Sequence, residues 1–255
     1  MVEAFGISDP GLVRKGNEDG YICNERLKLF VVADGMGGHS AGEVASRLAL
    51  EAVEGFIRRS HEDSDFSWPY GVDPQLSLGG NRLRTAVHLA NRRVFRASES
   101  CDDYTGMGTT ITATLISDDR LAYGHVGDSR LYELNGDGFR QVTRDDTWIA
   151  TILANDPNMS KEDLAHHPMR HVLTNVLGAR EQVEVQLAEV RLKPGMLFLL
   201  CSDGLYGMAG DEAIERILRA GGPLEAMGKQ LIRAALDGGG HDNITAVLIR
   251  HTGEP

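Results

Sequence analysis

Residues 27–43, LKLFVVADGMGGHSAGE, decide how this chain is interpreted. They begin with the apolar run 29–33, whose β-branched and aromatic side chains predict a buried strand. The run stops at Asp34, and an ionised carboxylate at the end of a buried strand is costly unless a positive charge meets it. Glycines follow whose backbone can approach a ligand closely, and Ser40 with Glu43 fits a capping box for the next helix. Together these features indicate a site.

The pattern of an apolar run followed by an aspartate occurs twice more. Residues 196–201 form a second apolar run, which ends in Ser202-Asp203-Gly204. The glycine-rich segment 238–241 leads through Asp242 into the strand predicted at 244–249. Because three aspartates stand at strand ends beside glycine or a tight loop, the repetition is stronger evidence for a site than any single copy.

Composition and charge argue against several classes of protein. The chain has 255 residues and a formal net charge of −11, which argues against nucleic acid or an anionic membrane as the main partner. Its three cysteines lack Cys-x-x-Cys spacing and are interpreted as reduced thiols. No signal-peptide pattern is evident, and the apolar runs are far shorter than the ~20 residues that span a bilayer. We therefore expect a soluble, cytoplasmic protein.

Helical and strand patterns are segregated along the chain. The predicted strands are residues 4–8, 20–24, 29–34, 109–117, 120–126, 130–134, 139–142, 183–192, 196–201 and 244–249, and the predicted helices are 41–59, 81–98, 211–220 and 223–236. Residues 109–142 are expected to form an antiparallel meander. The segregation favours an α+β fold of layered antiparallel sheets over a doubly wound parallel sheet. We expect one domain over residues 1–255, with the polar segment at about 147–170 as a flap over a site.

The strand-end carboxylates favour hard cations that prefer oxygen ligands. No cluster of cysteine and histidine accompanies them, so Mg²⁺ or Mn²⁺ is expected in place of zinc. The carbonyl of Gly35 can complete a coordination shell, and Glu18 would add a fourth carboxylate, so that the four charges roughly balance two divalent ions. Two ions ~3.5–4 Å apart can hold a bridging hydroxide and stabilise an in-line displacement at phosphorus. Arg14, which precedes Glu18, is suited to binding a phosphate dianion.

These residues resemble the metal-dependent protein serine/threonine phosphatases of the PPM family (protein phosphatase type 2C), most closely its compact bacterial members. The similar motifs follow the family order along nearly the whole chain, and in that order they are highly specific. They are Arg14 with Asn17-Glu18-Asp19, Asp34-Gly35-Met36-Gly37-Gly38-His39, Gly108-Thr109-Thr110, Val126-Gly127-Asp128-Ser129-Arg130, Leu173-Thr174, Ser202-Asp203-Gly204 and Asp242-Asn243-Ile244-Thr245.

The resemblance implies a four-layer α/β/β/α sandwich, with two antiparallel sheets flanked by helices. It makes Asp34 the ligand that bridges two ions and Gly35 a carbonyl ligand, with Glu18 acting through water. Asp203 and Asp242 would hold the other ion, Asp128 would join Asp203 at a possible third metal, and Arg14 would bind the substrate phosphate. The expected partners are phosphoproteins, including a Ser/Thr protein kinase and its substrates, and the expected state is a monomer.

Two other functions remain open at this stage. One is a catalytically silent module that binds phosphopeptides without hydrolysing them, although no expected metal ligand is missing from the sequence to support it. The other is a serine hydrolase, because residues 38–42 fit Gly-x-Ser-x-Gly around Ser40, with Asp203 and His241 following in nucleophile–acid–base order. The hydrolase fits poorly, since the nucleophile should follow a strand directly and the predicted strand ends at Asp34.

Overall fold

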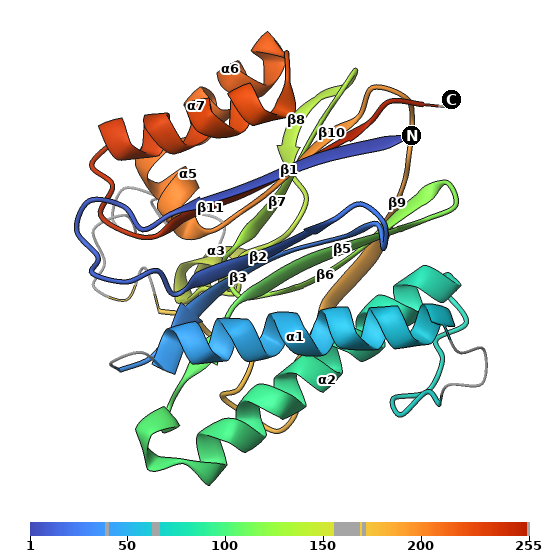
Figure 1. Cartoon of the computed structure of the whole chain (residues 1–255), viewed down its shortest axis with the longest axis vertical. Coiled ribbons are helices and arrows are strands. Elements are labelled where there is room, and N and C mark those ends of the chain that lie inside the picture. Colours follow the sequence, from blue (N-terminus) through green and yellow to red (C-terminus); the bar gives the residue numbers. More distant parts are fainter. Residues whose placement is uncertain (39–40, 63–66, 156–168, 170–171, 254–255) are drawn as a thin grey trace.

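Two antiparallel sheets pack face to face in the middle of the molecule, and helices cover both outer faces (Figure 1). The computed structural model describes residues 1–38, 41–62, 67–155, 169 and 172–253. The strands are β1 (Val2–Asp9), β2 (Asp19–Asn24), β3 (Leu29–Met36), β4 (Gly108–Thr109), β5 (Ile111–Ser117), β6 (Arg120–Val126), β7 (Arg130–Asn135), β8 (Gly138–Gln141), β9 (Gln186–Arg191), β10 (Leu197–Cys201) and β11 (Ile244–His251). The helices are α1 (Ala41–Glu62), α2 (Leu78–Ser100), the 3-10 turn η1 (Asp102–Tyr104), α3 (Trp148–Asn155), α5 (Asp203–Ala209), α6 (Asp211–Ala220) and α7 (Leu224–Asp237). The predicted α+β sandwich is confirmed.

The chain changes sheets several times. One sheet has the strand order β1-β11-β10-β7-β8, and the other has the order β2-β3-β5-β6-β9, with β4 paired to β3. β6 and β7 therefore belong to different sheets, and the chain passes from one to the other through residues 127–129. The predicted meander over residues 109–142 is wrong, because its first hairpin, β5–β6, and its second, β7–β8, pair in separate sheets.

Three apolar layers hold the sandwich together. Along β3, Leu29 and Val31 pack against α1 and α2, whereas Phe30 and Val32 lie between the two sheets. This alternation follows from the two-residue repeat of a strand, and it explains why the whole run is apolar, since both faces of the strand are covered. A third layer packs α5, α6 and α7 on the outer face of the other sheet.

The ends of several elements differ from the sequence-based expectation. β3 does not end at Asp34 but continues to Met36, because Gly35 and Met36 pair with β4. α5 was not predicted, and Asp203 is its first residue. Ser40, the proposed helix cap and the nucleophile of the hydrolase alternative, lies outside the described residues, as does His39. Among the described helices, none combines the length and apolar character that crossing a membrane requires.

Candidate metal centre

The acidic residues singled out in the sequence come together at one end of the sandwich. Asp34 on β3 is the register partner of Asp19 on β2, so these two lie on neighbouring strands of one sheet. In the other sheet, the backbone N–H of Ser202 donates to the carbonyl of Thr245 at 3.1 Å, which brings the start of α5 beside the start of β11. The carboxyl group of Asp34 lies within the electrostatic influence of four others, from Asp19, Asp203, Asp128 and Asp242. The fold therefore gathers carboxylates from five separate segments.

The backbone of Asp34 is held on both sides by threonines. Its N–H donates to Thr110 Oγ1 at 3.0 Å, and its carbonyl accepts from the N–H of Thr110 and from Thr109 Oγ1, both at 2.9 Å. Part of its surface stays accessible. Burial, and then the negative charges of the neighbouring carboxylates, raise the pKa of Asp34 well above its usual value.

Asp19 belongs to this group, although the sequence analysis gave it no role. Its Oδ2 accepts hydrogen bonds from Ser202 Oγ and Thr245 Oγ1, both at 2.7 Å. Its Oδ1 is buried without a hydrogen-bond partner. Burial raises its pKa to about 6, although the two hydroxyl hydrogen bonds act in the opposite direction. No pattern in the sequence distinguished it from a surface acid beside Glu18, because its partners come from distant segments.

Close backbone contacts fix Gly35 and Glu18. A Cβ atom on Gly35 would lie 2.0 Å from the carbonyl oxygen of Gly42, so the start of α1 presses directly on β3. A Cβ atom on Gly42 would lie 2.8 Å from Glu18 Oε2. The N–H of Gly35 donates to the carbonyl of Glu18 at 3.2 Å. Burial is also the main cause that raises the pKa of Glu18. Glycine is needed at both positions because any side chain there would force β3, the start of α1 and Glu18 apart.

Arg14 lies at the mouth of the group and binds a carboxylate. Its guanidinium Nη2 is 2.7 Å from Asp242 Oδ2, a carboxylate that lies 228 residues further along the chain. Asn243 organises the loop that carries Arg14, because its Nδ2 donates to the carbonyls of Pro10 and Gly16 and its Oδ1 accepts from the N–H of Glu18. The Arg14 side chain is 54% exposed, so it faces the solvent side of the site.

Asp128 lies in the segment that crosses between the sheets, beside the base of the predicted flap. Its side chain is largely buried, and burial, followed by the charge of Asp203, raises its pKa to about 7. Next to it, the N–H of Gly127 donates to Asp146 Oδ2 at 3.1 Å, and the N–H of Asp146 donates to the carbonyl of Gly127 at 2.7 Å. Asp146 Oδ2 also accepts from Asn175. The crossing segment is thus tied to the chain that leads into α3.

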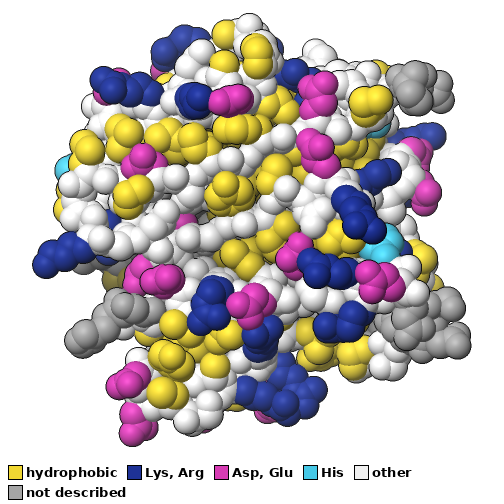
Figure 2. Space-filling view, viewed as in Figure 1, with side chains coloured by type: hydrophobic (Ala, Val, Ile, Leu, Met, Phe, Trp, Pro, Cys, Tyr) yellow, Lys and Arg dark blue, Asp and Glu magenta, His cyan; other side chains and the backbone are white. Residues whose placement is uncertain are grey.

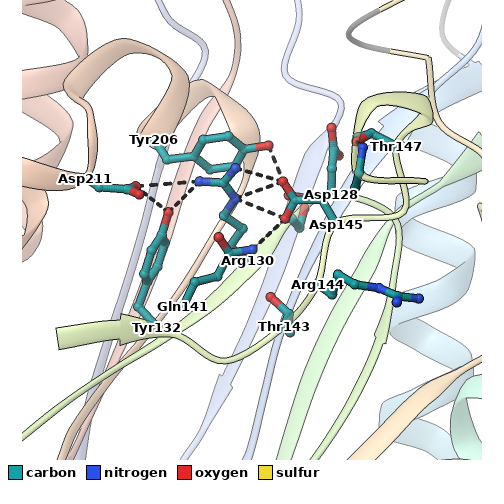
Figure 3. Close-up of polar contacts among 12 residues, drawn as sticks. Asp128, Arg130, Tyr132, Gln141, Thr143, Arg144, Asp145, Thr147, Tyr206 and Asp211 are labelled. Carbon is teal, nitrogen blue, oxygen red and sulfur yellow. Dashed lines mark hydrogen bonds and ion pairs between the residues drawn. The ribbon is translucent and has the colours of Figure 1, made fainter. Parts of the chain in front are cut away.

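Arg130 is the centre of a polar network beside Asp128 (Figure 3). Its guanidinium donates to both carboxylate oxygens of Asp145, and its Nη1 donates to the hydroxyl of Tyr132 at 2.8 Å. It also lies over the ring of Tyr206, 3.5 Å from the ring centre, and the Tyr206 hydroxyl donates to the carbonyl of Asp128. Figure 3 shows Tyr132 on one side of the guanidinium and Asp145 on the other. The network connects β7, α5 and the segment before α3, and sequence reasoning did not assign it.

The donor set fits hard divalent cations. Every candidate ligand offers a carboxylate or carbonyl oxygen, as Mg²⁺ and Mn²⁺ prefer. The side chains of the described residues do not form a ready-made cluster of three or more His, Cys, Asp or Glu ligands. However, Asp19 carries a buried oxygen with no hydrogen bond, and burial, together with repulsion between the carboxylates, raises the pKa of Asp34, Asp19 and Asp128. Cations at this end of the sandwich would offset that repulsion.

Comparison with known proteins agrees with this geometry. The sequence model of the family described as "Protein phosphatase 2C" matches residues 18–244. The chain is 39% identical over 244 residues to the serine/threonine protein phosphatase PstP of Mycobacterium tuberculosis. This alignment covers 94% of the present chain and 43% of PstP. It is 33% identical over 249 residues to the serine/threonine phosphatase stp of Listeria innocua, covering 95% and 93% of the two chains.

A solved structure shares the fold throughout. The catalytic domain of PstP in complex with two manganese ions superposes with a TM-score of 0.81 at 36% sequence identity, covering 99% of each chain. The present chain spans less than half the length of the first curated relative that it matches. The sequence similarity to PstP therefore says nothing about the remainder of that relative, which this chain does not cover.

Proposed function

Since this chain belongs to the protein phosphatase 2C family, we propose that it is a metal-dependent protein phosphatase that hydrolyses phosphoserine and phosphothreonine monoesters. The observation that carries the proposal is the position of Asp34, whose carboxyl group lies near those of Asp19, Asp203, Asp128 and Asp242 from separate segments. Phosphate monoesters hydrolyse extremely slowly without a catalyst, and a site that concentrates divalent cations serves that reaction well.

We assign the ligands as follows. Asp34 and the carbonyl of Gly35 would hold the Mn²⁺ or Mg²⁺ ions together with Glu18, which would act through water, and Asp203 and Asp242 would hold the other ion. Asp128 would hold a third ion together with Asp203, and the buried position of Asp128 near Asp203 supports this assignment. When bound, the ions supply Lewis-acid activation and neutralise charge that develops on the phosphate. The protein's own contribution is to hold the acids rigidly through Thr109, Thr110 and the Asp19 hydrogen bonds.

Arg14 is the proposed phosphate-binding residue. Its half-exposed guanidinium is held by Asp242, a proposed metal ligand. The planar fork of donors of the guanidinium is suited to the dianionic phosphate of a substrate, and cations held by Asp242 would weaken its competing ion pair with Arg14. This role differs from that of the metal ligands, because Arg14 binds substrate and does not hold the ions.

The remaining parts of the proposal concern organisation and context. We propose that residues 1–255 act as one phosphatase domain and that the segment at about 147–170 serves as its flap. The described part of that segment includes α3, and the bonds between Asp146 and Gly127 support a position next to Asp128. Residues 156–168 and 170–171 of the segment lie outside the described residues. We further propose phosphoprotein partners, including a Ser/Thr protein kinase and its substrates, a cytoplasmic location and a monomeric state.

Hydrolysis of p-nitrophenyl phosphate tests the proposal. EDTA should abolish turnover and Mn²⁺ should restore it. Asp203→Asn should lose most of the activity and keep the circular dichroism spectrum of the wild type, since the amide has the same shape but no charge. The matched control is Asp237→Asn, at the exposed end of α7, which should behave like the wild type. Full activity in Asp203→Asn would contradict the ligand assignment.

Two outcomes would support the alternative functions. A folded, metal-loaded protein that binds phosphopeptides without turning them over would favour the silent binding module. Activity that survives EDTA but is lost on treatment with a fluorophosphonate would favour the serine hydrolase.

A further inference from the structure

Basic and acidic side chains are interspersed on the face of the molecule that Figure 2 shows. On α1, for example, Arg47 pairs with Glu51, and both side chains are exposed, so their pair contributes little. The ion pair of Arg130 with Asp145 differs, because both side chains are largely buried and their charges act on Asp128, a proposed metal ligand. This interior network therefore offers a way to control the position of a ligand.

The neighbours of Asp128 in the chain are tied to one part of the protein. Before it, Gly127 exchanges two hydrogen bonds with Asp146, one through the N–H and one through the carbonyl of Gly127. After it, the carbonyl of Ser129 accepts from Thr112 Oγ1, on β5, at 2.7 Å. These bonds fix the crossing segment relative to the sheet that contains β5 and to the chain that leads into α3, but they do not reach α5.

A tyrosine joins Asp128 itself to α5. The hydroxyl of Tyr206 donates to the backbone carbonyl of Asp128 at 3.1 Å. Tyr206 comes three residues after Asp203, the first residue of α5. Residues three apart on a helix lie on the same face, so the side chains of Tyr206 and Asp203 leave α5 on the same side. One short helix thus carries one proposed ligand of the third ion and binds the backbone of the other.

Such a bond opposes the repulsion between the two ligands. Burial, and then the charge of Asp203, raise the pKa of Asp128, so the two carboxyl groups repel each other while no cation lies between them. α5 has only seven residues, two of them glycine, and a helix of that length depends on contacts with its surroundings for its position. The hydrogen bond of Tyr206 to Asp128 is one such contact, and it acts between the two segments that repel.

Arg130 holds the ring of Tyr206 in the orientation that this bond requires. The guanidinium carbon lies 3.5 Å from the centre of the ring. The guanidinium is itself fixed by three hydrogen bonds to Asp145 and one to Tyr132. Figure 3 shows the Tyr206 ring over the guanidinium, with its hydroxyl on the side of Asp128 and Asp145. The network therefore sets the direction in which the hydroxyl points.

We propose that Tyr206 is a positioning residue for the third ion, whose hydroxyl keeps Asp128 close enough to Asp203 for both carboxylates to bind one cation. The inference rests on the proposed function, and in particular on Asp128 as a ligand. It adds a role for a residue that is not a ligand and acts through the backbone of one. Removal of a group that orients a metal ligand typically lowers metal affinity about 10- to 100-fold.

Binding of Mn²⁺ without substrate tests the proposal. A titration followed by the electron paramagnetic resonance signal of free Mn²⁺ gives the number of bound ions and their Kd values. Tyr206→Phe removes the hydroxyl and keeps the ring that covers Arg130, so the fold is retained. We expect Tyr206→Phe to bind two ions like the wild type and the third with a Kd raised about tenfold or more. Asp128→Asn should lose the same ion, which identifies the binding step that belongs to Asp128.

Tyr132→Phe is the matched control. It removes a hydroxyl from the same network, but that hydroxyl bonds to Arg130 and Asp211 and not to Asp128. Because two hydrogen bonds are lost in place of one, urea unfolding should show a destabilisation at least as large as in Tyr206→Phe. All three ions should nevertheless bind as they do to the wild type. A third ion that Tyr206→Phe binds like the wild type, or that both variants weaken equally, would overturn the proposal.

The positioning role and the proposed function fail differently. If the wild type binds three ions and Tyr206→Phe binds them equally tightly, only the role of Tyr206 fails. If the wild type binds two ions and hydrolyses p-nitrophenyl phosphate, the roles of Asp128 and Tyr206 fail together and the phosphatase function stands. If the wild type binds no Mn²⁺ and hydrolyses no p-nitrophenyl phosphate, the phosphatase function itself fails.

Discussion

Arg130 is the residue whose replacement the structure predicts in most detail. Its guanidinium donates three hydrogen bonds of 2.7–3.2 Å to Asp145 and one to Tyr132, and it covers the ring of Tyr206. Methionine has a similar length and no charge or donor. Arg130→Met therefore removes all of these contacts at once and leaves the carboxylate of Asp145 without its cation.

The cost of this change follows from burial. The side chains of Arg130 and Asp145 are 17% and 15% exposed, so both charges are largely withdrawn from water. Removal of one partner from a buried ion pair costs about 3–5 kcal/mol, and a desolvated cation–π contact contributes about 2 kcal/mol. Because the pair retains some solvent contact, we expect the free energy of unfolding to fall by about 4 kcal/mol in total. For a domain of this size that corresponds to roughly 10 °C in Tm.

Urea unfolding followed by circular dichroism measures the effect. The matched control is Arg233→Met on α7, whose ion pair with Asp237 is 76% and 62% exposed and should contribute less than about 1 kcal/mol. Asp145→Asn added to Arg130→Met should recover part of the loss, since it removes the uncompensated charge. A loss in Arg130→Met no larger than in the control would refute the reasoning that this network stabilises the fold.

Three further predictions concern the site itself. Arg14→Ala should raise KM for phosphoesters about tenfold or more with a smaller change in kcat, and steady-state kinetics that show an unchanged KM would remove its phosphate-binding role. In the metal-free protein, the pKa of Asp19 is raised from 3.8 to about 6 and that of Asp128 from 3.8 to about 7. Between pH 3.8 and these raised values the folded state therefore binds more protons than the unfolded state, so the free energy of unfolding falls as the pH rises through this range. Thermal unfolding in EDTA should therefore give a lower Tm at pH 8 than at pH 5, and Mn²⁺ should reverse the loss at pH 8; a Tm that rises with pH in EDTA contradicts this. Gly204→Ala places a Cβ 2.0 Å from the carbonyl oxygen of Asn243, so it should destabilise the protein by about 2 kcal/mol or more in urea, and wild-type stability would show that α5 can shift without cost.

The sequence was sufficient to predict the layered α+β fold and most of its helices and strands. β3, α1 and α2 can each be recognised from the apolar pattern of their own segment, a continuous run in β3 and a helical repeat in α1 and α2. α5 was not predicted, because its seven residues include two glycines and form one short helix after β10. The sheet change at residues 127–129 was also missed, since a short turn with glycine, aspartate and serine looks the same whether the next strand pairs with the last one or enters another sheet.

The site was predictable where a pattern repeated. Asp34, Asp203 and Asp242 each follow or precede an apolar run, and the fold brings their segments together at one end. Asp19 was not predictable in this way, since its burial depends on Ser202 and Thr245, which lie far from it in sequence. Similarly, the partner of Arg14 could not be found from spacing, because Asp242 comes from the other end of the chain.

The central claim, that these carboxylates hold divalent cations, is tested most directly by the number of Mn²⁺ ions bound per chain. Equilibrium dialysis followed by elemental analysis should give at least two ions for the wild type and fewer for Asp34→Asn, with both proteins folded by circular dichroism. A folded wild-type protein that binds no Mn²⁺ at millimolar concentration, or an Asp34→Asn variant that binds as many ions as the wild type, would contradict the account.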